Sequence, residues 1–480
     1  MKASLNTKPV VPLLHKLAYA APAFALALVG IPVYIYIPKF YTDVVGVHMT
    51  VLGYLVLAVR LFDALTDPAI GFLSDRTRTP FGRRRPYMAV GSGLLALTIY
   101  LLFNPPAGSP TFETLWFGVF MFALFFFWTV VVVPYESLGP EITFDYHERT
   151  TLFALRDGAL IAGTLVAASS PALVAWLYGL AGSVEGERAK FFWISVWYAP
   201  LVLGFSWWCV LSIREKRQVQ STTDLGFFEG VRQVWRNRPF VILLVSYTVS
   251  AFGSNLPATL ILYYVEYVLQ SKHADVFLAL YFVTGVLFLP CWIGISRKMG
   301  KKPTWILSMV INTGAFVAVF FLGPGDAAIY GALVVVSGIG FGATLALPSA
   351  MQADVIDYDE LLCGRRREGQ YVGLWSVSKK LAAALGVGTA LTILGMIGYQ
   401  PGVQQTEEVM LGLRMLYALV PSVCNFVALL IATTYPISAA VHGDIKAAIA
   451  RRKSGRVTKD PLNPHRILSQ QPSDAWAEMA

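Results

Sequence analysis

The 480-residue sequence contains few charged residues. Only 14% of its residues are Asp, Glu, Lys or Arg, whereas a soluble protein carries about 25%. Hydrophobic residues make up 56% of the chain, and they recur in apolar runs of about 20 residues, each long enough to cross a hydrocarbon core about 30 Å thick. The scarcity of charge therefore excludes an ordinary soluble domain and indicates a polytopic membrane protein.

Residue patterns that support catalysis are also missing from the sequence. It has no Gly-rich phosphate loop, no His/Cys spacing typical of a metal site and no Ser-His-Asp candidate. Four cysteines (Cys209, Cys291, Cys363 and Cys424) are far apart and form no CxxC motif, which favours small apolar fillers or free thiols. We therefore expect no enzyme, no resident cofactor and no ATP-driven pump.

The apolar runs predict an all-α fold of twelve transmembrane helices, because helix is the default for lipid-exposed backbone. Their approximate cores are residues 17–42, 50–74, 87–104, 112–139, 150–180, 190–213, 239–269, 274–296, 304–323, 327–356, 369–398 and 409–436.

The basic residues concentrate in alternate loops. The stretches "DRTRTPFGRRRP", "RKMGKKP" and "GRRR" follow the second, eighth and tenth predicted spans, whereas the opposite loops "NPPAGSP" and "GPGDAA" contain no Lys or Arg. Basic loops face the cytoplasm, so both termini are expected there, in a plasma (inner) membrane. The same distribution explains the net charge of +9 without a nucleic-acid partner.

The chain divides into two sets of six predicted spans. We predict an N-terminal half at 1–213, a central loop at 214–238, a C-terminal half at 239–438 and a partly disordered tail at 439–480. The halves echo each other, because "FGRRRP" and "MGKKPT" each follow the second span of a half, and "PYESLGPEITFDY" and "PSAMQADVIDY" each end the fourth. Duplicated halves place a substrate site near the bilayer midplane and permit alternating access.

Two carboxylates lie inside the second apolar run, "RLFDALTDPAIGFLSD". Asp63 and Asp67 share one helix face, near the middle of the membrane, where an ionised Asp costs about 2.5–3.5 kcal/mol. The pair repels itself unless a cation binds between the two groups or one is protonated. Thr66 adds an oxygen ligand. The pattern predicts a Na⁺ or H⁺ site, with an ion pair between these acids and Arg60 as the alternative.

Other polar residues interrupt the later spans. Thr129 offers a hydroxyl from the fourth span, and Arg156 lies near the start of the fifth span. Lys379 and Lys380 lie inside the eleventh, and one of them is expected to face the bundle interior because neighbouring residues point about 100° apart on a helix.

The basic turns are expected to latch neighbouring helix ends on the cytoplasmic side. Such latches would form in one gate state and break in the other. The residues predicted for this cytoplasmic gate are Asp75, Arg83, Glu141, Asp145, Asp354 and Asp357.

Several of these stretches together resemble the glycoside–pentoside–hexuronide:cation symporters of the major facilitator superfamily. They are "FYTDVVGV", "DALTDPAIGFLSDRTRTPFGRRRP", "PYESLGPEITFDYHERT", "DVIDYDELLCGRRREGQYVGLW" and "KKLAAALGVGTALTILGMIGY". Sodium-dependent lysophosphatidylcholine symporters are more distant relatives. The likeness spans residues 15–440 and implies the major facilitator superfamily fold.

The resemblance also implies roles for individual residues. Asp63, Asp67 and Thr129 match the family's cation-site residues, whereas Arg156 and Lys380 match substrate-site cations. Thr66 stands where a galactoside carrier of the family has asparagine, which leaves Na⁺, Li⁺ and H⁺ open as coupling ions.

A second departure concerns the substrate. Where that galactoside carrier has carboxylates that bind sugar hydroxyls, this chain has Ala27 and Val132. Neither side chain can accept a hydrogen bond, so the site, with Arg156 and Lys380, favours an acidic or partly apolar ligand.

The sequence therefore predicts a monomeric, cation-coupled symporter for a sugar, glycoside or other organic, acidic solute. Two alternatives stay open at this point: a lysophospholipid or amphiphile symporter, and a non-transporting membrane receptor on the same fold.

Overall fold

A computed structural model of the chain describes residues 11–142, 146–180, 182–213, 215, 234–364 and 368–468. Side chains at 75, 140, 141, 146–150, 154, 345, 368 and 369 are also outside the description. The predicted gate residues Asp75, Glu141 and Asp145 thus lie outside the described side chains, as does most of the central loop.

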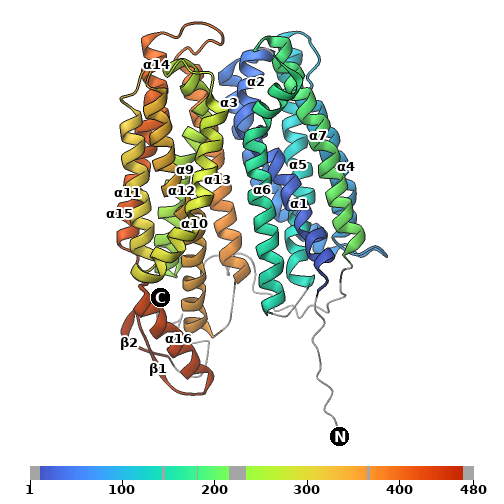
Figure 1. Cartoon of the computed structure of the whole chain (residues 1–480). Coiled ribbons are helices and arrows are strands. Elements are labelled where there is room, and N and C mark those ends of the chain that lie inside the picture. The colour runs from blue at the N-terminus through green and yellow to red at the C-terminus, as the bar shows by residue number, and fades with distance from the viewer. Residues whose placement is uncertain are drawn as a thin grey trace. The chain divides into compact units, whose positions relative to one another are not determined.

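The part of the chain before the central loop forms a series of long helices (Figure 1). They are α1 (Leu13–Ile31), η1 (Pro32–Tyr36), α2 (Ile37–Phe40), η2 (Tyr41–Val45), α3 (Met49–Arg76), α4 (Arg85–Phe103), α5 (Pro110–Ile142), α6 (Tyr146–Tyr178) and α7 (Val184–Ser212), where η denotes a π-helix.

A second series follows the central loop. It consists of α9 (Arg238–Tyr263), η3 (Tyr264–Val268), α10 (Ala274–Met299), α11 (Lys301–Val319), α12 (Ala327–Cys363), α13 (Glu368–Met396), α14 (Glu407–Arg414), η4 (Met415–Leu419), α15 (Val420–Thr433), α16 (Ala439–Lys453), β1 (Thr458–Asp460) and β2 (Asn463–Leu468).

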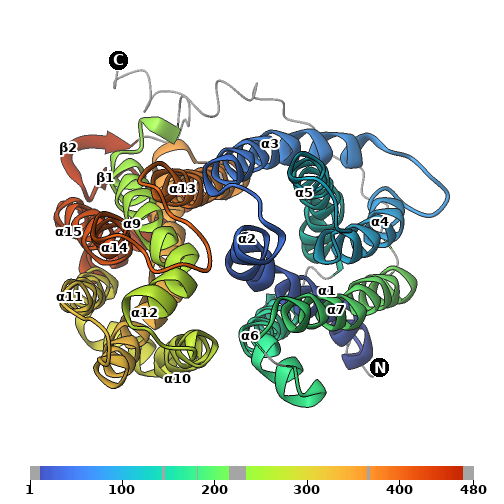
Figure 2. The ribbon, with the colours of Figure 1, turned by 90° about the horizontal axis from the view of Figure 1, so that it is seen from above.

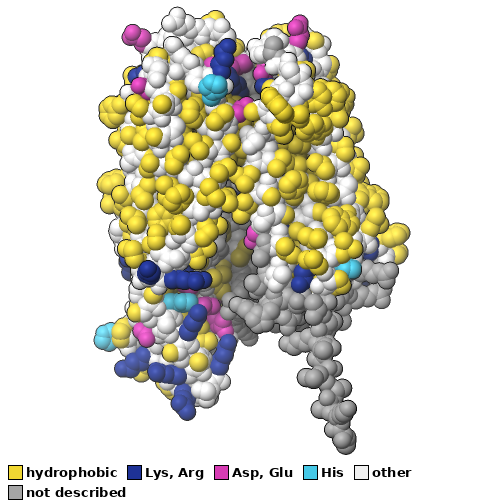
Figure 3. Space-filling view, viewed as in Figure 1, with side chains coloured by type: hydrophobic (Ala, Val, Ile, Leu, Met, Phe, Trp, Pro, Cys, Tyr) yellow, Lys and Arg dark blue, Asp and Glu magenta, His cyan; other side chains and the backbone are white. Residues whose placement is uncertain are grey.

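Membrane-spanning length confirms the predicted all-α polytopic fold. Among the described residues, 11 helical segments are long and apolar enough to cross a membrane. The ninth predicted span corresponds to α11, which is outside this set and carries Lys301, Lys302 and Asn312. Twelve spans therefore stays a prediction. On the face in Figure 3, hydrophobic side chains cover the helices between their ends.

The chain forms two compact units. The first combines Met1–Gln220 with Ala258–Ala279 and Val387–Leu413, and the second combines Ser221–Pro257 with Leu280–Gly386 and Arg414–Ala480. Two segments of the second helical series thus pack with the first series. The predicted half boundaries at 213 and 238 stay predictions.

In the first unit, α1 packs against α6 and α7, while α4 packs against α5 and α7 (Figure 2). Aromatic rings join α2 and η2 to this group: the rings of Phe40 on α2 and Phe191 on α7 lie 4.3 Å apart, and those of Tyr41 on η2 and Phe117 on α5 lie 4.6 Å apart. Gly46 ends η2 with a φ of 99°, a left-handed conformation that glycine adopts without steric penalty.

In the second unit, a buried cluster surrounds Tyr371 and Trp305. The ring of Phe240 lies 4.7 Å from that of Tyr371, and the amide of Asn237 donates to the Tyr371 hydroxyl at 3.0 Å. Gly300, with a φ of 89°, makes the turn between α10 and α11.

The chain after residue 438 is ordered up to residue 468. The Ser438 hydroxyl accepts a hydrogen bond from the Val441 backbone N–H and caps α16. Strands β1 and β2 pair antiparallel, and α16 packs against α12. The hydroxyl of Tyr358 on α12 donates to Asp460 at 3.0 Å. The predicted tail therefore contains a folded element, whereas residues 469–480 lie outside the described residues.

Close packing of α1 against α6 requires a glycine. A Cβ at Gly163 would lie 2.4 Å from the carbonyl oxygen of Phe24 and 2.9 Å from the Ala27 Cβ. We therefore expect Gly163→Ala to separate the two helices and to destabilise the protein by about 1–3 kcal/mol, seen as a lower melting temperature in detergent. Gly158→Ala, on the same helix with nothing within 4 Å, is the matched control. Equal melting temperatures for both variants would contradict this packing.

Candidate functional site

The two membrane carboxylates of α3 lie against a hydroxyl of α5. Asp63 and Asp67 are one helical turn apart, and the Thr129 hydroxyl lies 2.9 Å from Asp63 Oδ1 and 3.0 Å from Asp67 Oδ1. Asp63 is 3% exposed and Thr129 is 1% exposed, while Asp67 is half-buried. The structure therefore brings together three of the four residues predicted for a cation site.

The Thr129 hydroxyl alone cannot satisfy both carboxylates. A threonine hydroxyl has one hydrogen, so Thr129 donates to one carboxylate at a time or shares the hydrogen between both. Two ionised carboxylates facing one hydroxyl in a buried place repel each other strongly. A bound cation, or a proton on one carboxyl group, would remove this repulsion. The arrangement is suited to binding one positive charge.

Thr66 is placed differently from the other three. Its hydroxyl donates to the Asp63 backbone carbonyl at 3.1 Å, a bond to its own helix of the kind that serine and threonine commonly make. Its side chain is half-buried. The described contacts of Thr66 do not join it to the Thr129 hydroxyl.

Arg60, which the sequence offered as an ion-pair partner, is stacked on aromatic rings. Its guanidinium carbon lies 3.8 Å from the centre of the Tyr34 ring and 4.7 Å from that of Phe125. The side chain is 4% exposed, and its charge interacts with that of Asp63. Stacking of this kind stabilises a buried cation, so Arg60 adds positive potential beside the acids while aromatic groups hold it in position.

The predicted substrate residues belong to both units. Arg156 on α6 binds its neighbour, with Nε and Nη2 at 2.9 and 2.7 Å from Asp157 Oδ1. Ala27 lies on α1 beside Gly163, and Val132 lies on α5; both are half-buried. All these residues are in the first unit, whereas Lys380, also half-buried, lies on α13 in the second.

An aromatic group beside Arg156 was missing from the sequence prediction. Tyr19 of α1 interacts electrostatically with Arg156, and its ring lies 5.0 Å from that of Tyr135 on α5. The Tyr135 hydroxyl donates to the Tyr19 carbonyl at 2.7 Å. Gly139 makes room for this arrangement, since a Cβ there would lie 2.1 Å from the Tyr19 hydroxyl. One sequence signal could have identified Tyr19. It lies about two turns before the predicted substrate residue Ala27, on the same face of the same helix.

The described gate residues form contacts at the basic helix ends. Lys301 binds Asp354 at 2.6 Å, and His442 of α16 lies 3.3 Å from Asp354 and 3.0 Å from Asp357. The Arg83 backbone N–H donates to Glu215 Oε2 at 2.7 Å. His442 and Glu215 were not predicted, because their partners are distant in sequence.

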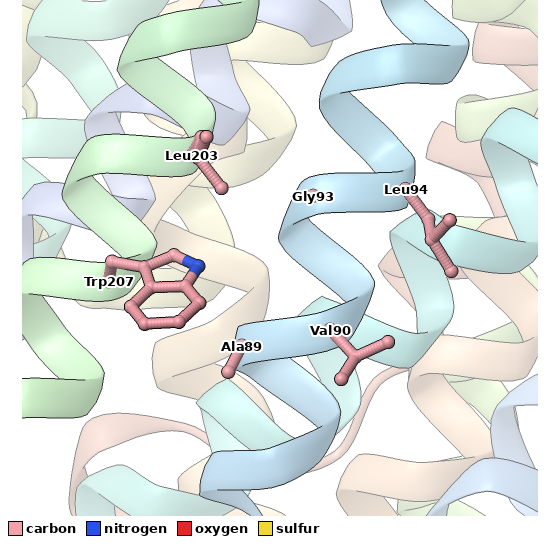
Figure 4. A pocket seen from close by; sticks show the side chains of 6 residues that line it. All are labelled: Ala89, Val90, Gly93, Leu94, Leu203 and Trp207. Atoms are coloured by element: carbon pink, nitrogen blue, oxygen red, sulfur yellow. The ribbon is translucent and has the colours of Figure 1, made fainter.

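One apolar hollow lies apart from these residues. Its volume is about 460 Å³, and Ala89, Val90, Gly93 and Leu94 of α4 line it together with Leu203 and Trp207 of α7 (Figure 4). The lining has no charged group to bind a polar solute, so it fits lipid hydrocarbon.

The long apolar helices identify the chain as a polytopic membrane protein. The sequence profile of the family described as "MFS/sugar transport protein" matches residues 18–439. The chain belongs to this family, which confirms the resemblance seen in the sequence and excludes an enzyme.

Curated relatives cover nearly the whole chain. The glucuronide carrier protein homolog of Escherichia coli K12 is 28% identical and aligns with 92% of this chain and 95% of its own. The putative sulfoquinovose importer of Salmonella typhimurium is 27% identical, with 92% and 93% covered. The isoprimeverose transporter of Lactiplantibacillus pentosus is 27% identical, with 88% of each chain covered.

Solved structures support the fold. The crystal structure of the nucleoside transporter NupG superimposes with a TM-score of 0.62 at 14% identity, covering 88% of this chain and 100% of NupG. At this identity the likeness concerns the fold alone.

Thr129→Val should destabilise the protein. The substitution preserves shape but removes the hydroxyl that faces both carboxylates, and a hydrogen bond to a charged group contributes about 1.5–3 kcal/mol. Thr98→Val is the matched control, because the Thr98 hydroxyl donates within its own helix, to Leu94 O at 2.7 Å. Thermal unfolding of the purified variants measures the difference. If Thr129→Val melts at the same temperature as Thr98→Val, the contact of the Thr129 hydroxyl with Asp63 and Asp67 does not stabilise the protein.

Proposed function

We propose that the protein is a cation-coupled symporter that moves an acidic sugar across the membrane by alternating access. The observation that carries the proposal is the shared Thr129 hydroxyl between Asp63 and Asp67. Burying two acids is unfavourable by several kcal/mol unless their charge is compensated. A transported Na⁺, Li⁺ or H⁺ that binds at the pair would supply this compensation. Binding of the ion and of the substrate then support each other reciprocally.

The substrate class follows from the sign of the surrounding charges. Arg156 supplies a guanidinium, which pairs well with a carboxylate or sulfonate, while Ala27 and Val132 offer sugar hydroxyls no acceptor. Two relatives are named for acidic sugars, a glucuronide and sulfoquinovose. These names support an acidic sugar as the substrate of this chain.

A neutral glycoside is the second candidate. It is favoured by the relative named for isoprimeverose, whose pentose and hexose units carry no charge. A lysophospholipid is less well supported, since the apolar hollow on α4 and α7 contains none of the predicted site residues.

The remaining assignments are also proposals. We propose that both termini face the cytoplasm, as the basic helix ends favour, that the membrane is the plasma membrane, and that the carrier works as a monomer. A receptor on the same fold would tolerate replacement of Asp63 and Asp67, whereas a symporter would not.

Asp67→Cys is expected to abolish concentrative uptake. The substitution removes one carboxylate of the pair, so the ion gradient can no longer drive the solute. Uptake of a radiolabelled glucuronide or sulfoquinovose into proteoliposomes, with imposed Na⁺, Li⁺ or pH gradients, measures the effect. Asp444→Asn on α16 is the control and should accumulate substrate normally. Accumulation by Asp67→Cys would refute ion coupling at this pair.

Arg156→Gln is expected to weaken binding of the acidic sugar about 10–100-fold, because a charge-assisted hydrogen bond is lost. Binding of a neutral glycoside should change far less. Arg188→Gln is the control, since Arg188 donates to the Pro105 carbonyl and has no assigned contact with substrate. Equal losses for acidic and neutral sugars would show that Arg156 does not recognise the acidic group.

A further inference from the structure

A second charged cluster occupies the opposite helix ends of the first unit. Lys39 of α2 bonds to Asp43 of η2, one turn further along, and its Nζ also lies 2.5 Å from Glu266 Oε2 of η3. The side chains of Lys39 and Asp43 are 18% and 14% exposed, whereas that of Glu266 is 47% exposed. The ammonium group therefore lies between two carboxylates.

Tyrosines surround this ammonium group. Lys39 Nζ lies 5.0 Å from the ring centre of Tyr263 and 5.4 Å from that of Tyr267, within the range of cation–π attraction. The Tyr399 hydroxyl donates to Asp43 Oδ1 at 2.9 Å, and the hydroxyls of Thr42 and Tyr263 lie 3.1 Å apart.

The cluster connects parts of the chain that are far apart in sequence. Tyr399 and Asp43 are separated by 356 positions, and Tyr263 and Thr42 by 221. Lys39 and Asp43 belong to the first six-helix half predicted from the sequence, and Glu266, Tyr263 and Tyr399 to the second. All of these residues lie within the first compact unit.

The hydroxyl of Tyr399 stays a donor in this cluster. Burial, followed by the negative charge of Asp43, raises the pKa of Tyr399 far above its usual value, so the phenol remains protonated and Asp43 remains the acceptor.

The two ion pairs of Lys39 differ in how easily they separate. Lys39 and Asp43 lie on one continuous helical segment and can stay paired in any arrangement of the halves. Glu266 is half-exposed, so water can replace Lys39 at its carboxylate, and an exposed pair of this kind contributes only about 0.2–1 kcal/mol. The Lys39–Glu266 contact is therefore the one that can open reversibly.

Close helix packing accompanies the ion pair. A Cβ on Gly53 of α3 would lie 2.6 Å from the Thr392 hydroxyl of α13, and a Cβ on Gly395 would lie 2.4 Å from the Thr50 hydroxyl. Thr392 and Gly395 precede Tyr399 by about one or two helical turns, so this seam leads to the cluster.

We propose that Lys39, Asp43 and Glu266, held by Tyr263, Tyr267 and Tyr399, form a reversible lock between the two six-helix halves, at the helix ends remote from the basic loops. The lock rests on the proposed alternating access. When the halves part, the Lys39–Glu266 ion pair opens together with the Tyr399–Asp43 and Thr42–Tyr263 hydrogen bonds, and these contacts re-form when the halves close.

The test measures exposure of the seam beneath the lock. Thr392→Cys is introduced into a chain whose four native cysteines are replaced, and a polar maleimide labels the purified full-length protein in lipid nanodiscs. Lys39→Met and Glu266→Gln should each raise the labelling rate about fivefold, as expected for loss of about 1 kcal/mol. Asp326→Asn is the matched control, because its carboxylate bonds to Gly323 N in its own loop and its loss should not change labelling.

Two outcomes would overturn the lock: labelling of Glu266→Gln at the parent rate, or an equal increase in Asp326→Asn. If Lys39→Met fails to fold, the labelling rate of Glu266→Gln, at a half-exposed position, tests the lock by itself. Repeating the measurement with Asp67→Asn separates the two proposals, because the lock predicts the same increase whether or not ion coupling operates at Asp67.

Discussion

One contact links the two membrane carboxylates: the Thr129 hydroxyl faces a carboxylate oxygen of both Asp63 and Asp67. A single hydroxyl hydrogen cannot be donated fully to both carboxylates at once, and a further positive charge near the pair lowers the repulsion between them. Arg60, stacked on Tyr34 and Phe125, contributes a fixed positive potential beside the pair. Unlike a transported ion, this charge stays in the protein. In the proposed symport, a mobile ion adds to this compensation, and the electrostatics of the acid pair would then couple ion binding to transport.

Much of the fold follows from sequence because membrane helices satisfy their own backbone hydrogen bonds. The apolar runs predicted α1, α3, α5 and α12 from the sequence of each span alone, with no information on its neighbouring helices. The four-residue spacing of Asp63 and Asp67 likewise predicted that both side chains lie on one face of α3. The resemblance to a known family added Thr129 and Arg156, whose roles no local pattern reveals.

The features that sequence reasoning missed depend on contacts across the chain. Glu266 binds Lys39, a residue more than 200 positions earlier in the chain. His442 lies in a polar tail that looked partly disordered, yet it contacts Asp354 and Asp357. Each pairing depends on how distant segments fold together, and periodicity along one helix carries no information about that.

Titration of the purified protein with Na⁺ and Li⁺ at several pH values, with proton uptake recorded in weak buffer, tests the central claim most directly. The account predicts that each chain binds one metal ion or takes up one proton, saturably, and that Asp63→Asn loses this response. Saturable binding that is identical in the native protein and in Asp63→Asn, or no binding of any of the three ions, would contradict it.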